Sequence, residues 1–251
     1  MSRVRVVVLC AGKGKRMKTD IPKPLIKIDG KPILQRLVES IKASGVDTNP
    51  IIVTSPEHPR MCEEFGETCA HAIQHEQLGT AHALLCAKEE ANGADHVIVL
   101  YGDHPFFSAG RLQALAKKQI DEGNTVTLMT TKIPSFDGWY TAFSTWARVL
   151  RDATGTFVAI RENKDASEAE RRILEVNPGL YCFKTSWVWD HLSQIKNDNV
   201  QKEYYLTDLI KMAVNEGVKM SSVEAPPEEV IGINTPEERD IAEQVLKQKT
   251  A

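Results

Sequence analysis

The sequence has few cysteines and lacks the cysteine spacings that bind metal or cycle between thiol and disulfide. Its five cysteines, Cys10, Cys62, Cys69, Cys86 and Cys182, are odd in number, and none belongs to a Cys-x-x-Cys motif. A disulfide framework is therefore not expected. We interpret the cysteines as reduced packing residues and predict a cytoplasmic protein.

Long apolar runs and a strong excess of charge are also missing. No stretch approaches 18 consecutive apolar residues, and the apolar N-terminal segment is too short for a signal peptide. The net charge of −3 gives no global field that would favour nucleic acid or a membrane. The 251 residues suffice for one large α/β domain. We expect a monomer or small homo-oligomer with small-molecule substrates, no nucleic-acid partner and no membrane.

Both familiar phosphate-loop patterns fail in the glycine-containing segment VVVLCAGKGKRM at residues 6–17. A dinucleotide fingerprint needs a glycine three residues after Gly14, where this chain has Met17. A P-loop needs Ser or Thr after its Gly-Lys pair, but here Lys13 is followed by Gly14 and Lys15 by Arg16. The chemistry still favours phosphate, because glycines let backbone N–H groups approach an anion.

Cations are concentrated around this loop. Residues 12–27 carry six cations and one Asp within an acidic chain, which fits a small anionic ligand better than a polymer. Lys23 stands between Pro22 and Pro24. Because proline fixes φ, we expect a stiffened segment that presents the Lys23 ammonium to a phosphate.

Strand-like and helix-like segments alternate along the chain. We predict strands over 3–10, 50–55, 72–74, 96–103, 125–131, 173–183 and 230–234, and helices over 32–45, 79–93, 110–123, 167–172, 186–195, 204–217 and 235–248. Capping boxes mark two helix starts, Ser167 with Glu170 and Thr235 with Glu238. This order predicts an α/β fold with a doubly wound, mostly parallel, Rossmann-like sheet. We expect one domain over 1–251, with about 132–210 forming a subregion over the edge of the sheet.

Ligands of open parallel sheets bind beyond the carboxyl ends of the strands. The Gly12–Arg16 loop follows the predicted strand over 3–10, and Asp103 and Asn234 are the last residues of the predicted strands over 96–103 and 230–234. We expect Asp103 to lie in a surface loop. A carboxylate and an amide oxygen together suit Mg²⁺, which keeps several waters and shares its coordination sphere with phosphates.

Seven segments occur in an order that resembles the sugar-phosphate nucleotidyltransferases. They are LCAGKGKRM…PKPL, QHEQLGTAHAL, LYGDHPFF, RENKDAS, EVNPGLYCF, EYYLTDLI and GIN, and they cover nearly the whole chain. The sequence is most similar to the pyrophosphorylase domain of bacterial N-acetylglucosamine-1-phosphate uridylyltransferase. The resemblance implies a GT-A-like nucleotidyltransferase fold, Mg²⁺ as cofactor, and transfer from a nucleoside triphosphate, with UTP expected, to a sugar 1-phosphate.

The resemblance also implies roles for individual residues. Arg16 and Lys23 would contact phosphates during catalysis, and Asp103 with Asn234 would bind Mg²⁺. The nucleotide would be held by Cys10, Ala11, Gly12, Lys13, Gly14, Gln74, Gln77, Gly79, Thr80, Tyr101 and Gly102, with Gln74 and the Gly79-Thr80 segment reading the base. The sugar would be held by Glu162, Asn177, Tyr205 and Thr207.

The chain departs from the family pattern at several positions. Cys10 and Lys15 replace small residues and Thr, and His104 replaces a small or aliphatic residue beside Asp103. The Gly-Tyr-Gly-Arg turn that contacts the sugar is replaced by FSTWARVLRD at residues 143–152. We interpret the nearby aromatics, Trp139, Tyr140, Phe143 and Trp146, as packing residues rather than as a sugar-stacking wall. The identity of the sugar stays open, with N-acetylglucosamine 1-phosphate as the leading candidate, and without hexapeptide repeats no acetyltransferase activity is expected.

Two alternative functions remain open at this stage. A cytidylyltransferase acting on a polyol phosphate shares the glycine-rich start and the lysine, although the QLGTAHA segment with Gln74 favours the sugar 1-phosphate branch. A non-catalytic nucleotide-sugar sensing subunit would share the fold. The presence of Lys23, Asp103 and Asn234 favours an enzyme, since a sensor does not need a metal pair.

Overall fold

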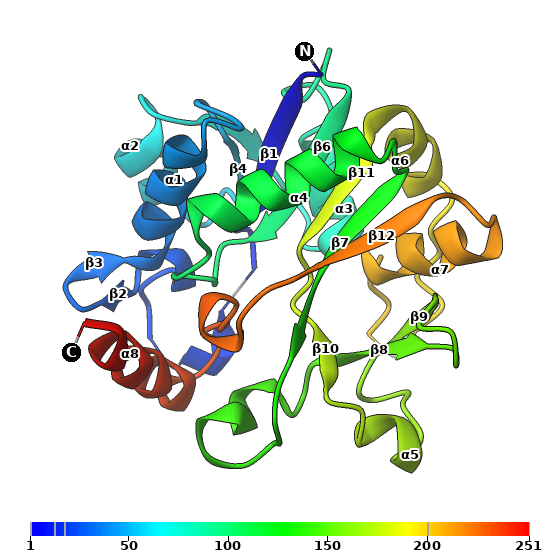
Figure 1. Cartoon of the computed structure of the whole chain (residues 1–251). Coiled ribbons are helices and arrows are strands. Elements are labelled where there is room, and N and C mark those ends of the chain that lie inside the picture. The colour runs from blue at the N-terminus through cyan, green and yellow to red at the C-terminus, as the bar shows by residue number, and fades with distance from the viewer. Residues whose placement is uncertain (1, 13, 18, 200, 251) are drawn as a thin grey trace.

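The protein folds around a mixed, mostly parallel sheet with helices on both faces (Figure 1). The computed structural model describes residues 2–12, 14–17, 19–199 and 201–250. The large sheet has the strand order β5-β4-β1-β6-β11-β7-β10-β8-β9, with β12 beside β7. Its strands are β1 (Val4–Leu9), β4 (Ile51–Thr54), β5 (Ala70–Ile73), β6 (His96–Tyr101), β7 (Val126–Lys132), β8 (Ala147–Arg151), β9 (Phe157–Arg161), β10 (Glu175–Asn177), β11 (Tyr181–Lys184) and β12 (Met220–Glu224).

The strand directions confirm the predicted fold class. Strand β1 pairs in parallel with β4 and β6, β4 pairs in parallel with β5, and β7 pairs in parallel with β12. Strand β11 runs against this direction in the central part, since it is antiparallel to both β6 and β7. Strands β10, β8 and β9 extend the sheet by antiparallel pairing. A two-stranded hairpin, β2 (Lys27–Ile28) with β3 (Lys31–Pro32), lies apart from the large sheet.

All of the helices except α5 (Glu168–Arg171) contribute to one of two hydrophobic cores. They are α1 (Ile33–Ser44), α2 (Pro59–Phe65), α3 (Thr80–Cys86), α4 (Ala109–Asp121), α5 (Glu168–Arg171), α6 (Thr185–Leu192), α7 (Thr207–Asn215) and α8 (Pro236–Thr250), with short 3₁₀ turns η1 (Lys15–Met17), η2 (Lys23–Leu25), η3 (Gly138–Phe143) and η4 (Pro227–Glu229). One core joins α1, α2 and α4 to the sheet and the other joins α3, α6 and α7 to its opposite face. Figure 1 shows α4 crossing in front of the sheet.

The buried strand β1 shows why the sequence folds in this way. Val6 and Val8 point into one core and Val7 and Leu9 into the other, because successive side chains of a strand alternate between faces. An uninterrupted β-branched run is therefore required where helices cover both faces.

One predicted strand differs from the structure near Pro178 and Gly179. The predicted strand over 173–183 is two strands, β10 and β11, which pair with different parts of β7. Gly179 has φ of 78°, and a Cβ at this position would lie 2.2 Å from Tyr101 Cε2. The chain can change strands here because glycine tolerates this backbone conformation and leaves room for the tyrosine ring.

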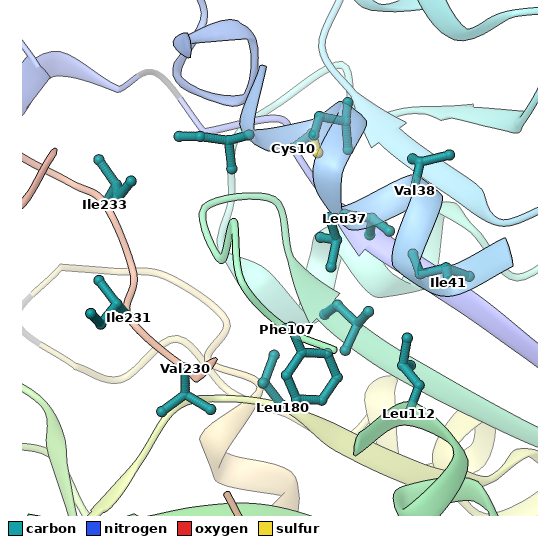
Figure 2. Packing of buried hydrophobic residues seen from close by; sticks show 14 of the residues in the cluster. Cys10, Leu37, Val38, Ile41, Phe107, Leu112, Leu180, Val230, Ile231 and Ile233 are labelled. Atoms are coloured by element: carbon teal, nitrogen blue, oxygen red, sulfur yellow. The ribbon is translucent and has the colours of Figure 1, made fainter. Parts of the chain in front are cut away.

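The predicted strand over 230–234 is wrong. Val230, Ile231 and Ile233 are buried in the same cluster as Phe107 and Leu180, but they lie in an extended segment without strand pairing (Figure 2). The apolar sequence pattern indicates that the segment is buried, but it does not distinguish a strand from a buried loop. Strand β12 was not predicted, because it is only half-buried and has the mixed sequence MSSVE.

The lengths of two other elements also differ from prediction. The predicted helix over 79–93 is helical only as α3, and hydrogen-bonded turns follow it. Helix α7 begins at Thr207, so Tyr204 and Tyr205 precede it. These two tyrosines belong to a segment that contacts the start of α3, where Ala81 N donates to Tyr204 O.

The aromatic residues after β7 form a packed group. Phe143 is fully buried, with its ring 4.7 Å from Trp146 and 5.8 Å from Trp139. Trp139 stacks on Tyr140 at 4.1 Å. The packing interpretation therefore holds for Phe143. The buried Arg148 fixes the turn before β8 by donating to the carbonyls of Ser144 and Trp146.

All five cysteines are unpaired, as predicted. Within the described residues, no helix combines the length and apolar character needed to cross a bilayer.

Candidate active site

A cavity of about 530 Å³ opens beyond the carboxyl ends of β1 and β6. It gathers most of the predicted nucleotide-binding residues, namely Cys10, Ala11, Gly12, Gln74, Gln77, Gly79, Thr80, Tyr101 and Gly102, together with Lys23 and Asp103. Lys13 lies outside the described residues. Gly14 is not part of the described lining, but its φ of 58° turns the chain toward Lys23, whose Cβ would be 3.4 Å from a Cβ at Gly14. We call this space the nucleotide cavity.

The loop after β1 offers backbone groups to this cavity. The Cys10 N–H donates to Val53 O at 2.8 Å, so this amide is already used within the sheet. Among described residues, the amides of Ala11 and Gly12 have no such partner. The Cys10 side chain packs against the backbone of Gly102, where a Cβ would lie 2.4 Å from Sγ. Burial raises the pKa of the Cys10 thiol and Asp103 adds to the rise, so the group is held as a neutral packing residue.

Position 79 must be a glycine, because the backbone of Tyr204 passes close to it. Its φ is 118°, and a Cβ there would lie 2.5 Å from Tyr204 O. Backbone bonds from Tyr204 N to Leu78 O and from Ala81 N to Tyr204 O join the two segments. The Thr80 hydroxyl accepts a bond from Leu206 N at 2.9 Å. The start of α3 is therefore fixed to the segment before α7.

Gln74 has an exposed fraction of only 3%, yet it lines the nucleotide cavity. Its Nε2 lies 3.1 Å from Gly79 O and 3.0 Å from His82 Nδ1. No described residue donates to its Oε1. A free acceptor at the wall of a cavity suits a nucleobase edge.

Lys23 joins the two predicted metal ligands. Its Nζ lies 2.8 Å from Asp103 Oδ2 and 3.0 Å from Asn234 Oδ1. Arg16 also donates to Asn234 Oδ1 at 3.0 Å. Three segments distant in sequence thus meet at one point, and we call these four residues the cation junction.

The Asp103 carboxylate is buried, which corrects the prediction of a surface loop. Its exposed fraction is 9%, because the extended segment at 230–234 covers it. Burial alone would raise its pKa, but the Lys23 ammonium and His104 hold the pKa below its usual range. The buried Oδ1 has no hydrogen-bond partner among described residues, although His104 Nε2 lies 3.5 Å away. An ionised carboxylate with a free oxygen beside an amide oxygen fits a hard divalent cation.

Two sets of bonds hold Asn234 in place, although it does not end a strand. Ile233 N donates to Asp103 O at 3.0 Å, and His104 Nδ1 donates to Val230 O at 2.9 Å. The predicted capping box at the start of α8 is present, and Glu238 also accepts from Asn234 N at 2.5 Å. The helix cap therefore fixes the backbone that carries the amide oxygen.

A second cavity of about 500 Å³ lies on the other side of Tyr101 and Asp103. It contains the predicted sugar-binding residues Glu162, Asn177 and Thr207, with Arg16 and Asn234 at its junction end. Tyr205 lies in an adjoining cavity that shares Tyr101, Glu162 and Thr207. We call this combined space the acceptor cavity. Asp103 lines both the nucleotide cavity and the acceptor cavity, so the junction stands between them.

The predicted sugar ligands differ in how fully their polar atoms are already hydrogen-bonded within the protein. Asn177 is buried, donates to the Tyr181 hydroxyl at 2.7 Å and accepts from Gly179 N at 3.1 Å. Glu162 hydrogen-bonds Thr207, and burial raises the pKa of its carboxyl. Glu162 is therefore the more available polar group for a ligand.

Sequence reasoning missed several residues of the site. His82 contacts Gln74, while His104 and Trp146 line the acceptor cavity. Glu238 carried a usable signal, because the capping box placed it next to Asn234. His104 directly follows Asp103, and Trp146 lies in the segment at 143–152, so the sequence marked both positions without assigning them to the site. His82 is reached only through its tertiary contact with Gln74.

Comparisons with known proteins agree with this geometry. Residues 6–198 match the model of the MobA-like NTP transferase domain. The chain is 36% identical over 250 residues to the bifunctional protein GlmU of Caldanaerobacter subterraneus subsp. tengcongensis, covering 99% of this chain and 53% of that protein. It is 35% identical over 246 residues to GlmU of Desulfotalea psychrophila, covering 97% of this chain and 70% of that protein. The chain thus spans about half the length of the first of these relatives.

A solved structure supports the fold. The CMP:2-keto-3-deoxy-manno-octonic acid synthetase complexed with CTP aligns with a TM-score of 0.70 over 99% of this chain and 100% of that one, at 19% identity. This similarity concerns the fold alone. Because the model of the MobA-like NTP transferase domain matches more than half of the chain, the chain belongs to this family.

Proposed function

We propose that the protein is a pyrophosphorylase that joins UTP and a hexose-sized sugar 1-phosphate, with N-acetylglucosamine 1-phosphate as the leading acceptor. The products are a UDP-sugar and pyrophosphate. The observation that carries the proposal is the cation junction, where Lys23 contacts Asp103 at 2.8 Å between the nucleotide and acceptor cavities. A donor phosphate and an acceptor phosphate brought to this point would meet the same positive charge.

The residues would act by positioning and by charge. The acceptor phosphate oxygen attacks the α-phosphorus of the triphosphate, the bond to the β-phosphate oxygen breaks, and pyrophosphate leaves in line. The acceptor phosphate is already ionised near neutral pH, so no general base is needed. Lys23 and Arg16 would bind phosphate oxygens and stabilise the charge of the transition state. Asp103 and Asn234 would hold Mg²⁺, which supplies further charge neutralisation when bound.

The base preference rests on Gln74. Its free Oε1 can accept from the N3–H of uracil, and a site built on such a bond discriminates strongly because a wrong partner leaves polar groups unpaired. Pyrophosphate release should be measured with UTP, CTP, ATP and GTP, each with several sugar 1-phosphates and a polyol phosphate. We expect the highest kcat/KM for UTP with a hexose 1-phosphate. Equal values for UTP and ATP would contradict the base assignment, and turnover only with CTP and a polyol phosphate would favour the cytidylyltransferase alternative.

Asp103→Asn tests the ionised junction. The variant keeps the size of the side chain but removes the charge that Lys23 and a divalent cation share. We expect turnover to fall by at least about a hundredfold, since such electrostatic groups contribute most to phosphoryl transfer. Circular dichroism should show an intact fold. Near-normal pyrophosphate release in Mg²⁺ by a folded variant would disprove the role of Asp103.

Lys23→Met tests whether the ammonium and a divalent cation compete for the same oxygens. Lys23 Nζ contacts Asp103 Oδ2 and Asn234 Oδ1, so removing it should free these two oxygens and remove a repelling charge. Mn²⁺ binding to the nucleotide-free protein, followed by electron paramagnetic resonance, should tighten about tenfold or more, while UTP affinity falls. Unchanged or weaker Mn²⁺ binding by the folded variant would contradict competition between Lys23 and the cation for the same oxygens.

Glu162→Ala tests the acceptor cavity. Loss of one carboxylate–hydroxyl hydrogen bond costs about 1.5–3 kcal/mol, so kcat/KM for the true sugar phosphate should fall roughly ten- to a hundredfold. The apparent affinity for UTP should stay almost unchanged, because Glu162 lines the acceptor cavity and not the nucleotide cavity. An equal loss of apparent affinity for UTP and of kcat/KM for the sugar phosphate would show that Glu162 is not a sugar ligand.

A further inference from the structure

His82 contacts a buried amide that faces the nucleotide cavity. It lies on α3, where its Nδ1 is 3.0 Å from Gln74 Nε2. The proposed mechanism gives His82 no part, and the ring itself does not line the cavity. Its effect on the ligand must therefore pass through Gln74. A role for His82 in nucleotide choice rests on the proposed function, since it concerns the base of the nucleotide.

The backbone of Gly79 determines which end of the Gln74 amide points inward. A carbonyl oxygen can only accept, so the atom 3.1 Å from Gly79 O must be the nitrogen. The carbonyl cannot turn away, because it also accepts from Ala83 N at 3.0 Å within α3. The positive φ of Gly79 and its contact with Tyr204 fix this peptide further.

The orientation of the amide in turn determines the tautomer of His82. An amide nitrogen donates and does not accept, so His82 Nδ1 must present its lone pair and carry its proton on Nε2. Both N–H groups of Gln74 are then used, one by Gly79 and one by His82. The remaining functional atom is Oε1, an acceptor without a protein donor among the described residues.

This arrangement distinguishes two bases of nearly the same shape. Uracil carries an N–H at position 3, which can donate to Oε1, whereas cytosine has a lone pair there. If the amide turned by 180°, Nε2 would face the base and cytosine would be accepted instead. We infer that His82 is a specificity-determining positioning residue, which accepts the second Gln74 N–H and thereby holds the amide in the orientation that selects uracil over cytosine.

The test compares UDP and CDP binding by calorimetry and kcat/KM for UTP and CTP in His82→Leu, which has no acceptor. We expect the uracil-to-cytosine preference to fall by about tenfold, the effect of one hydrogen bond, with an unchanged KM for the sugar phosphate. In His82→Asn the side-chain Oδ1 is as many bonds from the backbone as Nδ1 of histidine, and it can accept the same Gln74 N–H. The preference for uracil should therefore largely return. His75→Leu is the matched control, because it makes the same change at an exposed histidine and should leave the preference intact.

Several results would overturn the inference. An unchanged preference in folded His82→Leu would do so, and so would an equal loss for both bases, which would indicate a purely structural role. A wild-type protein that binds UDP and CDP equally would also contradict it. UDP can bind without a sugar phosphate. Selective UDP binding without pyrophosphate release would therefore count against the proposed function but leave the role of His82 standing.

Discussion

The site depends on one ammonium group held between two oxygens from distant parts of the chain. Lys23 is separated from Asp103 by 80 residues and from Asn234 by 211 residues. Two oxygen ligands brought together in a poorly solvated place repel each other unless a cation stands between them. The Lys23 side chain has an exposed fraction of 20%, so this charge compensates the carboxylate with little screening by solvent. The prolines before and after Lys23 restrict the backbone that carries the ammonium. The cap at Glu238 holds the backbone of Asn234.

Close backbone contacts connect the two cavities on either side of that junction. Tyr101 lines both, and its ring lies against the backbone of Gly179, where a Cβ would be 2.2 Å away. Gly79 makes a similar contact with Tyr204, where a Cβ would lie 2.5 Å from the carbonyl oxygen. Burial raises the pKa of the Tyr101 hydroxyl, so the residue acts as a neutral wall. Each of these two contacts leaves no room for a side chain, so a residue other than glycine at position 79 or 179 would displace a neighbour.

Residues at which a departure from the family pattern is expected lie on both sides of the junction. Trp146 lies with its ring centroid 6.0 Å from that of His104, and both line the acceptor cavity with Asp103. Burial lowers the pKa of His104, although the nearby Asp103 carboxylate opposes the change. The buried Arg148 fixes the turn that carries Trp146. On the nucleotide side, Cys10 is accommodated because Gly102 leaves space for its sulfur.

The resemblance to a known family supplied most of the residues expected around the cavities. The sequence by itself determined the order of the major elements and the fold class. It could do so because buried β-branched runs, apolar helix stripes and capping boxes are local patterns, and β1, α1 and the start of α8 follow from them. The tertiary structure alone decided that 230–234 is a buried extended segment, that β11 is inserted antiparallel, and that Asp103 is covered. It also decided the partner of Gln74. These outcomes depend on which distant segments share a face, and an apolar residue is equally compatible with a strand and with a buried loop until its neighbours are in place.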